Sequence, residues 1–304
     1  MHDEDRRELC HDALVGLSVG DALGAQYFVP GHHSADLVEG RVPGGLWDWT
    51  DDTEMACSVA AILREFGTID QDLLAEAFAQ RCEPYRGYGP GAVVLLHRIR
   101  DGAHWRTAAG ELFGGQGSCG NGAAMRVAPL GAYFADELET AAEQAARSAE
   151  VTHAHPEGIT GAVAVAVGAA LAGAARWGDV RPSAVEFLAV VGDQLDKGQV
   201  GRGIRRAREL LGRDVEEAAY KLGNGSQVTA QDTVPFCLWV AATHLDDYPA
   251  AVTSCVRVGG DIDTTSAIVG GIVAAYTGIG ERAGVRGVPR DWLAAREPLP
   301  DWLG

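Results

Sequence analysis

Apolar residues recur along most of the chain at the three-to-four-residue spacing of α-helices, whereas alternating, strand-like runs are scarce. Short segments of Gly, Pro, Asn and Asp separate the periodic stretches. The pattern predicts helices over residues 9–25, 54–66, 71–81, 91–100, 123–134, 137–152, 158–177, 183–195, 203–211, 215–222, 229–245, 249–258 and 264–277. No linker is long enough to divide the chain, so we expect one compact all-α domain over residues 1–304, built as a multi-helix bundle.

Several of these helices are apolar on more than one face, as the alternating Ala and Val of residues 162–167 show. Such helices belong inside a layered bundle. The apolar run over residues 162–175 is too short for a typical membrane span, so we interpret it as a buried helix. Functional residues are therefore expected at helix ends and in the loops that join them.

The chain is strongly acidic, with a net charge of −17 at pH 7 over 304 residues. That charge repels nucleic acid and anionic lipid, so we expect neither a nucleic-acid surface nor a membrane partner. The six cysteines form no Cys-x-x-Cys pair, and the charged first seven residues lack the apolar region of a signal peptide. These features favour a reducing, cytoplasmic location.

Two short clusters of like chemistry, Thr50–Thr53 and Asp261–Thr265, stand far apart in the chain, and each opens a predicted helix. Each combines Asp carboxylates with Thr hydroxyls, and neither has a His or Cys close by in sequence. Oxygen donors of this kind bind hard cations such as Mg²⁺ or Mn²⁺ and suit zinc poorly. If the fold brings the clusters together, they can hold one or two metal ions.

Helix capping is the competing interpretation of both clusters. Thr and Asp are favoured N-cap residues, and acidic residues in a first turn suit the helix dipole. Asp51 with Glu54 resembles a capping pair, and Asp261 or Asp263 can begin the last long helix. A cap needs one oxygen per helix, however, whereas these segments offer several.

Two further segments are candidates for the site. The glycine-rich stretch Gly114–Gly122 runs into a predicted helix, and its backbone amides can receive a phosphate or diphosphate. A plain flexible connection remains the alternative for that stretch. His153 ends another helix, either as part of a polar turn or as a donor to a phosphate or ribose oxygen. Asp21 lies in a glycine-rich helix and either satisfies backbone amides or orients other groups of the site.

These segments together resemble the ADP-ribosylglycohydrolase family, which includes the dinitrogenase-reductase-activating glycohydrolases. The resemblance runs from about Leu14 to about Tyr276, and its markers occur in the family's order. The markers are Gly20–Gly24, Trp49–Thr53, Gly117–Arg126, Thr152–His153 and Gly259–Thr264. The family fold is an orthogonal all-α bundle, in agreement with the helical pattern.

The resemblance implies a site for two Mg²⁺ or Mn²⁺ ions, with which family members cleave the N- or O-glycosidic bond that joins ADP-ribose to an acceptor. By analogy the metal ligands are Thr50, Asp51, Asp52, Asp261, Asp263 and Thr264. Asp51 or Asp52 is also the expected catalytic base. The diphosphate and its ribose would be held by Gly117, Ser118, Gly120, Asn121, Gly122 and His153, with Phe113 where relatives carry an aromatic that stacks on adenine.

The sequence departs from the family pattern at two places. Phe28 stands where relatives commonly carry a glutamate, and residues 86–89 lack an acid that some relatives have there. We therefore expect ADP-ribosylated arginine as substrate, with serine-linked ADP-ribose second, because relatives acting on serine rely on that glutamate. The alternatives are a catalytically silent ADP-ribose binder, an immunity-type protein that blocks a toxin, and a two-metal phosphoesterase acting on nucleotides.

Overall fold

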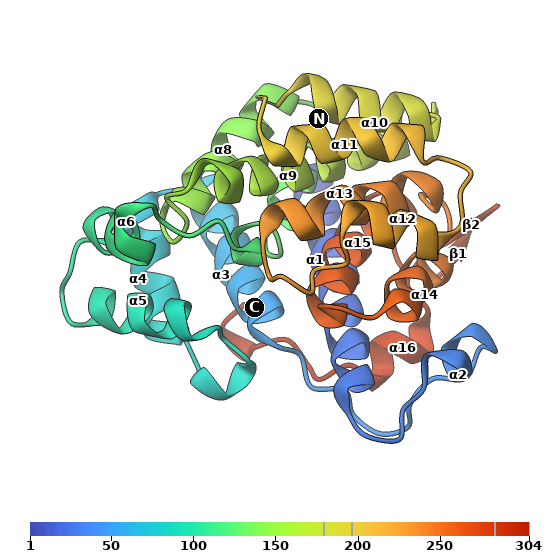
Figure 1. The fold of residues 1–304 in the computed structure, drawn as a ribbon, viewed down its shortest axis with the longest axis horizontal. Helices are drawn as coiled ribbons and strands as arrows, with labels where there is room; N and C mark the ends of the chain where they lie inside the picture. Colours follow the sequence, from blue (N-terminus) through green and yellow to red (C-terminus); the bar gives the residue numbers. More distant parts are fainter. Residues whose placement is uncertain (179, 196, 283, 304) are drawn as a thin grey trace.

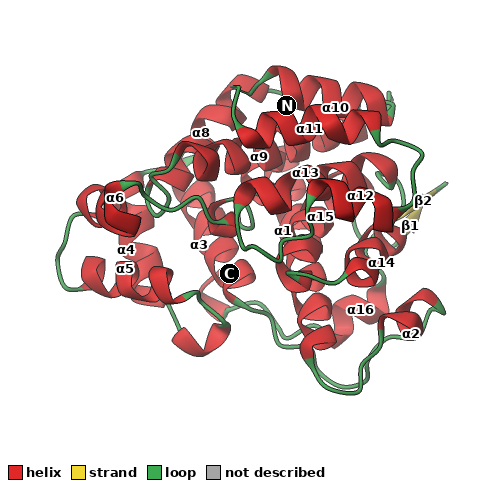
Figure 2. Cartoon of the chain, in the orientation of Figure 1, coloured by secondary structure: helices red, strands yellow, loops and turns green. Residues whose placement is uncertain are grey.

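The computed structural model describes residues 1–178, 180–195, 197–282 and 284–303. Over those residues the chain forms sixteen α-helices, a few short 3₁₀ turns and one two-stranded hairpin (Figures 1 and 2). The prediction of an all-α fold is therefore confirmed. The hairpin, β1 (Glu281–Arg282) and β2 (Val285–Arg286), lies at the edge of the molecule (Figure 1).

The helices of the first half are α1 (Asp3–Ala25), α2 (Ser34–Val38), α3 (Asp51–Phe66), α4 (Gln71–Arg81), α5 (Pro90–Arg100), α6 (Trp105–Gly115), α7 (Ala128–Tyr133) and α8 (Leu138–Glu150). Those of the second half are α9 (Pro156–Trp177), α10 (Ala184–Asp193), α11 (Gln199–Glu209), α12 (Val215–Leu222), α13 (Ala230–Thr243), α14 (Tyr248–Val258), α15 (Ile262–Thr277) and α16 (Arg290–Ala295). Figure 1 shows α1 and α15 near the centre, α8–α11 on one side of them, and α4–α6 as a group beside α3.

The two central helices, α1 and α15, touch along glycines spaced four residues apart. A Cβ added to Gly16 would lie 2.5 Å from the carbonyl oxygen of Gly270, and one added to Gly20 would lie 2.2 Å from that of Ser266. At Gly24 it would lie 2.7 Å from Cα of Asp263. The helices are thus antiparallel and in backbone contact, which sets the end of α1 against the start of α15.

The most apolar helix, α9, is a core element. It is long and apolar enough to cross a membrane by length and composition, but 72% of its most apolar window is buried inside the protein. It packs against α7, α8, α13 and α15, and Ala and Val residues face these neighbours on several sides. The pattern over residues 162–167 reflects this burial.

The predicted helix over residues 123–134 is wrong in its first half. A 3₁₀ turn covers Asn121–Ala123, and α7 begins only at Ala128. Pro129 explains the break, because proline has no amide hydrogen for an intrahelical bond and is tolerated only in a first turn. The pattern also missed α2, α6 and α16, which carry few apolar positions or include glycines.

The glycine contacts generate a paired prediction for stability. Gly16→Ala would place a Cβ 2.2 Å from that of Ala274, and we expect this overpacking to lower the free energy of unfolding by about 1–3 kcal/mol. Gly110, in α6, has open space where a Cβ would be, so Gly110→Ala should raise it by up to about 1 kcal/mol through helix propensity. Urea unfolding of the two variants checks the opposite signs, and equal effects would contradict the packing.

Candidate metal centre

The first acidic cluster lies at the amino-terminal end of α3. Thr50 is the N-cap, with its hydroxyl oxygen accepting from the amide of Asp52 at 3.4 Å, and Asp51 and Asp52 occupy the first turn. The capping interpretation is thus correct for Thr50, but the two carboxylates are not needed for the cap. Asp52 is buried, and Asp51 is half-buried beside it.

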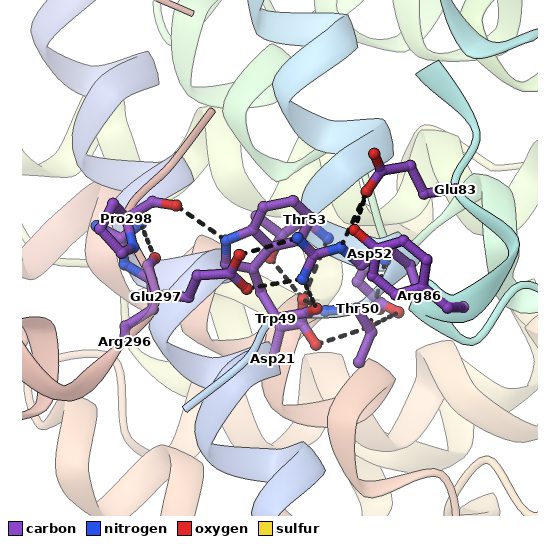
Figure 3. A network of polar contacts seen from close by, with 11 residues as sticks. Asp21, Trp49, Thr50, Asp52, Thr53, Glu83, Arg86, Arg296, Glu297 and Pro298 are labelled. Carbon is purple, nitrogen blue, oxygen red and sulfur yellow. Dashed lines mark hydrogen bonds and ion pairs between the residues drawn. The ribbon is translucent and has the colours of Figure 1, made fainter. Parts of the chain in front are cut away.

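Asp21, near the end of α1, is bonded to this cluster through four hydrogen bonds. Its carboxylate accepts from the amide and hydroxyl of Thr50 at 2.9 and 2.7 Å. It also accepts from the amide and hydroxyl of Thr53 at 3.2 and 2.5 Å. Figure 3 draws Asp21 together with these two threonines. Asp21 therefore does both things that the sequence suggested: it satisfies backbone amides, and it orients the residues around Asp52.

The second cluster lies at the start of α15, directly beside the first. Asp261 precedes the helix as its N-cap, and Asp263 stands in its first turn. The Thr264 hydroxyl lies 3.4 Å from Oδ2 of Asp52, and carboxylate oxygens of Asp21, Asp52 and Asp263 all lie within 4.8 Å of one another. The glycine contacts between α1 and α15 therefore bring the two clusters into one site.

The site holds negative charge that the surrounding protein does not neutralise. Among the described residues, no ion pair involves Asp21, Asp51, Asp52, Asp261 or Asp263. Burial, followed by the charge of Asp21, raises the pKa of Asp51 to about 7. Burial and neighbouring carboxylates hold the pKa values of Asp52 and Asp263 well above the usual range.

The donor set fits a hard divalent cation. Oδ1 of Asp52 is buried, and no described residue gives it a hydrogen-bond partner. An unpartnered buried carboxylate oxygen is costly unless a proton or a cation satisfies it. Carboxylates and threonine hydroxyls are oxygen donors that suit Mg²⁺ or Mn²⁺. Asp52, Asp263 and Thr264 are thus placed to share an ion, with Asp51 and Asp261 at the margin of the cluster.

The glycine-rich loop borders the acidic clusters through Asn121. Its side-chain amide donates to Oδ2 of Asp261 at 2.7 Å and lies 3.1 Å from the hydroxyl of Thr233. Gly117 has a positive φ of 74°, and a Cβ there would lie 2.7 Å from the amide nitrogen of His155. The loop is therefore fixed against the turn after α8, and the Ser118 hydroxyl accepts from the amide of Gly120 at 3.1 Å.

His153 lies under this loop as a buried, neutral imidazole. Burial, followed by the charge of Arg126, lowers the pKa of His153 to about 3. Arg126 donates to the Thr152 hydroxyl at 2.9 Å, and that hydroxyl lies 2.7 Å from Nδ1 of His153. Because the Thr152 hydroxyl can then donate its proton to Nδ1, this series of hydrogen bonds favours the His153 tautomer with its ring proton on Nε2. A Cβ on Gly120 would lie 3.3 Å from Nε2, so this nitrogen faces the loop.

Phe113, the expected adenine-stacking residue, lies at the surface. It adopts a positive φ of 52° within a kink at the end of α6, and 65% of it is exposed. Its ring edge lies 3.7 Å from where a Cβ on Gly91 would be. Phe28, the expected departure from the family pattern, is also exposed, at the end of the 3₁₀ turn after α1. The stacking role of Phe113 stays a prediction.

The sequence indicated Glu54 only as a capping partner of Asp51, but the structure has Thr50 as the N-cap and gives this buried acid other partners. Its Oε2 accepts from the Tyr88 hydroxyl at 2.6 Å and from the amide of Glu83 at 3.1 Å. These bonds hold the loop over residues 83–89 against α3, where a Cβ on Gly87 would lie 3.5 Å from Oδ1 of Asp51. The available signal was spacing, because Asp51 and Glu54 are three residues apart and share one face of the helix.

A separate cavity lies elsewhere in the molecule. It measures about 870 Å³ and is bordered by α2, α14, α16 and the end of α13, with Trp239, His244, Ser254, Arg257 and Arg290 among its lining residues. None of the predicted site residues lines it. The chemistry of the acidic clusters, and not cavity size, therefore identifies the candidate site.

Comparisons with known proteins agree with this geometry. The family model for ADP-ribosylglycohydrolase matches residues 2–303. The chain belongs to the ADP-ribosylglycohydrolase family. It is accordingly a hydrolase of that family. Its family relatives include an uncharacterized protein of Archaeoglobus fulgidus, 32% identical over 285 residues, with 88% of this chain and 87% of the relative covered.

Relatives with assigned names are more distant in sequence but equally extensive. The ADP-ribosylhydrolase ARH3 of Danio rerio is 28% identical, and the match covers 95% of this chain and 86% of the length of that relative. The ADP-ribosyl-[dinitrogen reductase] glycohydrolase of Rhodospirillum rubrum is 27% identical, covering 93% and 88%. A solved structure titled ADP-ribosylglycohydrolase-related protein complex matches with a TM-score of 0.65 and 25% identity, covering 97% of this chain and 94% of its own.

The raised pKa of Asp51 predicts a specific pH dependence for the metal-free protein. Between the unfolded aspartate pKa of about 3.9 and the folded value of about 7, the folded state binds a proton that the unfolded state has lost. The contribution of Asp51 to the free energy of unfolding is therefore present at low pH and is lost as pH rises through that window. Asparagine does not titrate, so Asp51→Asn lacks this decrease. The free energy of unfolding of the variant, relative to that of the wild type, should therefore increase from about pH 4 to pH 7.

Urea unfolding with EDTA present, at several pH values across this window, measures that difference. Comparing the variant with wild type cancels the opposite contribution of His153, whose lowered pKa favours the folded state as pH rises. A difference that does not change with pH would show that the Asp51 pKa is not raised.

Proposed function

We propose that the protein is a metal-dependent hydrolase that releases ADP-ribose from a modified acceptor, using one or two Mg²⁺ or Mn²⁺ ions. The observation that carries the proposal is the meeting of Asp52 and Asp263, from helices far apart in sequence, in a buried site with no cationic partner among the described residues. The family match over residues 2–303 supports the substrate class.

The acceptor that we propose first is ADP-ribosylated arginine. The relative from Rhodospirillum rubrum is named for an ADP-ribosylated protein substrate, dinitrogen reductase. Phe28 supports the same choice, because it replaces the glutamate on which serine-directed relatives rely. Serine-linked ADP-ribose is the second candidate.

In the proposed reaction, water attacks the anomeric carbon of the ribose, the glycosidic bond breaks, and the acceptor leaves with a proton. Bound cations would hold the ribose hydroxyls and lower the pKa of a bound water molecule. Asp51 is the residue that we assign to receive the proton, because it is half-buried and its pKa lies near neutrality. Asp52 is fully buried and accepts from the hydroxyl of Thr264, which suits a ligand.

The diphosphate would lie on the glycine-rich loop. Gly120 and Gly122 lie beside Nε2 of His153, and a neutral ring can donate from Nε2 to a phosphate or ribose oxygen. The lowered pKa of His153 means that this donor stays uncharged through the physiological range. The loop amides supply the remaining donors, which an acidic protein needs for an anionic ligand.

The proposal predicts the product and its dependence on metal. Arginine- and serine-ADP-ribosylated peptides are incubated with the protein and analysed by mass spectrometry, with and without EDTA. We expect intact ADP-ribose from the arginine peptide, formed only with divalent metal. AMP as product would instead show a phosphoesterase, and binding of ADP-ribose without turnover would show a silent or toxin-blocking binder.

Asp51→Asn should slow this turnover by about 100-fold or more, because the proton acceptor is lost while the fold remains. The measurement is kcat on the arginine peptide, with circular dichroism to confirm folding. Asp72→Asn, on the exposed start of α4, serves as the matched control and should keep full activity. Full activity of Asp51→Asn would remove the assigned role.

Asp52→Asn should change metal-free and metal-loaded stability in opposite directions. The carboxylate of Asp52 is repelled by its neighbours, and its Oδ1 has no partner among the described residues, so removing this charge should raise the midpoint of thermal unfolding in EDTA. The rise in midpoint that Mn²⁺ gives the wild type should be largely lost in the variant, since ligand binding to the folded state is what stabilises it. An equal Mn²⁺ response in both proteins would contradict the assignment of Asp52 as a ligand.

A further inference from the structure

The carboxy-terminal segment Ala295–Pro298 lies alongside residues 47–49, which lead into the first acidic cluster. The amide of Trp47 donates to the carbonyl oxygen of Ala295 at 2.7 Å, and the amide of Glu297 donates to that of Trp47 at 2.8 Å. The indole nitrogen of Trp49 donates to the carbonyl oxygen of Pro298 at 3.2 Å. The end of the chain thus forms a short parallel β-bridge with the approach to α3.

Arg86 ties these two segments to the loop over residues 83–89. Its guanidinium donates to both carboxylate oxygens of Glu297 at 2.7 and 2.9 Å. It also stacks on the ring of Trp49, at 3.4 Å from the ring centre, and donates to the carbonyl oxygen of Trp49 at 3.0 Å. In Figure 3 the guanidinium overlaps the ring of Trp49 and is joined by dashed lines to the carboxylate of Glu297.

One peptide group connects this arrangement to the carboxylates. The carbonyl of Trp49 and the amide of Thr50 belong to the same planar unit, so fixing one fixes the other. Arg86 holds the carbonyl, and Asp21 accepts from the amide at 2.9 Å. The orientation of this plane therefore sets the position of Thr50, and with it the first turn of α3.

We propose that Arg86 and Glu297 are positioning residues for the metal centre, and that the carboxy-terminal segment is part of its support. The pair orients the Trp49–Thr50 peptide, and through it Asp21 and the carboxylates of Asp51 and Asp52. This proposal rests on the proposed metal-dependent function. It concerns two residues that form no hydrogen bond or ion pair with the carboxylates of the proposed metal ligands in the described part of the chain, and that no motif of the sequence indicated.

The chemistry of the Arg86–Glu297 pair suits a role in orienting the Trp49–Thr50 peptide better than a role in stabilising the fold. Side-chain exposure is 10% for Arg86 and 23% for Glu297, so both charges are largely removed from water. A largely buried ion pair often contributes little net stability, because desolvation offsets the attraction. The planar fork of arginine, however, binds a carboxylate and a carbonyl at fixed angles, which the single ammonium of lysine does not reproduce. Glu297 in turn fixes the guanidinium against the ring of Trp49.

The test compares Mn²⁺ affinity in Arg86→Lys, Glu297→Gln and wild type, by electron paramagnetic resonance of free Mn²⁺. We expect Kd to rise about 10- to 100-fold in both variants, the usual effect of losing an outer partner of a metal ligand. Because the two residues act as one unit, the Kd for Mn²⁺ of the double variant should be little higher than that of either single variant.

Arg6→Gln is the matched control. Arg6 has 12% side-chain exposure, binds Asp136 and Glu137 at 2.8 and 2.6 Å, and lies over the ring of Tyr133. It stands fifteen residues before Asp21 on α1, about 22 Å along the helix. Its loss removes an ion-paired arginine of similar exposure, but it should leave the Kd for Mn²⁺ within about twofold of wild type, since remote sites act independently.

A second measurement does not require the variants to fold well. Because coupling is reciprocal, Mn²⁺ bound to the wild type should slow removal of the carboxy-terminal residues by a serine carboxypeptidase, whereas buffer with EDTA should not. Unchanged Kd values in both variants, or equal digestion with and without Mn²⁺, would overturn the positioning role while the proposed function stands. A wild type that binds no Mn²⁺ would overturn both.

Discussion

The rest of this structure depends on one constraint, the repulsion among carboxylates that lie close together in a largely buried site. Asp21, Asp52 and Asp263 approach within 4.8 Å of one another, and Oδ1 of Asp52 has no partner among the described residues. Such an arrangement is unfavourable unless protons or cations neutralise it, and the raised pKa values of Asp51, Asp52 and Asp263 express that cost. Residues selected only to cap two helices would not need to converge in this way.

The packing of α1 against α15 forces the convergence. Gly16, Gly20 and Gly24 allow the two backbones to touch, so Asp263 cannot move away from the end of α1 without breaking that contact. Asp21 of α1 then fixes the start of α3 beside the start of α15, because its carboxylate accepts four hydrogen bonds from Thr50 and Thr53. The site is thus held by the core on one side. On the other side, Arg86 and Glu297 hold the peptide that precedes Thr50.

Much of this could be predicted from the sequence, and for physical reasons. Apolar spacing indicates which segments are helical, and oxygen donors at two helix starts indicate a hard-cation site through local chemistry alone. Pro129 shows the limit of the pattern, because one missing amide divides a predicted helix. Glu54, Arg86 and Glu297 show another, since their partners depend on loop geometry that no local spacing encodes. The roles of Phe113, Ser118 and His153 toward a substrate remain predictions.

Anomalous diffraction from crystals grown with Mn²⁺ tests the central claim most directly. We expect an anomalous peak at coordination distance, about 2.2 Å, from carboxylate oxygens of both Asp52 and Asp263, with ligands drawn from both helix starts. A peak that contacts only one of the two clusters, or Mn²⁺ bound only at another part of the molecule such as the cavity beside α14, would contradict a metal centre shared by α3 and α15.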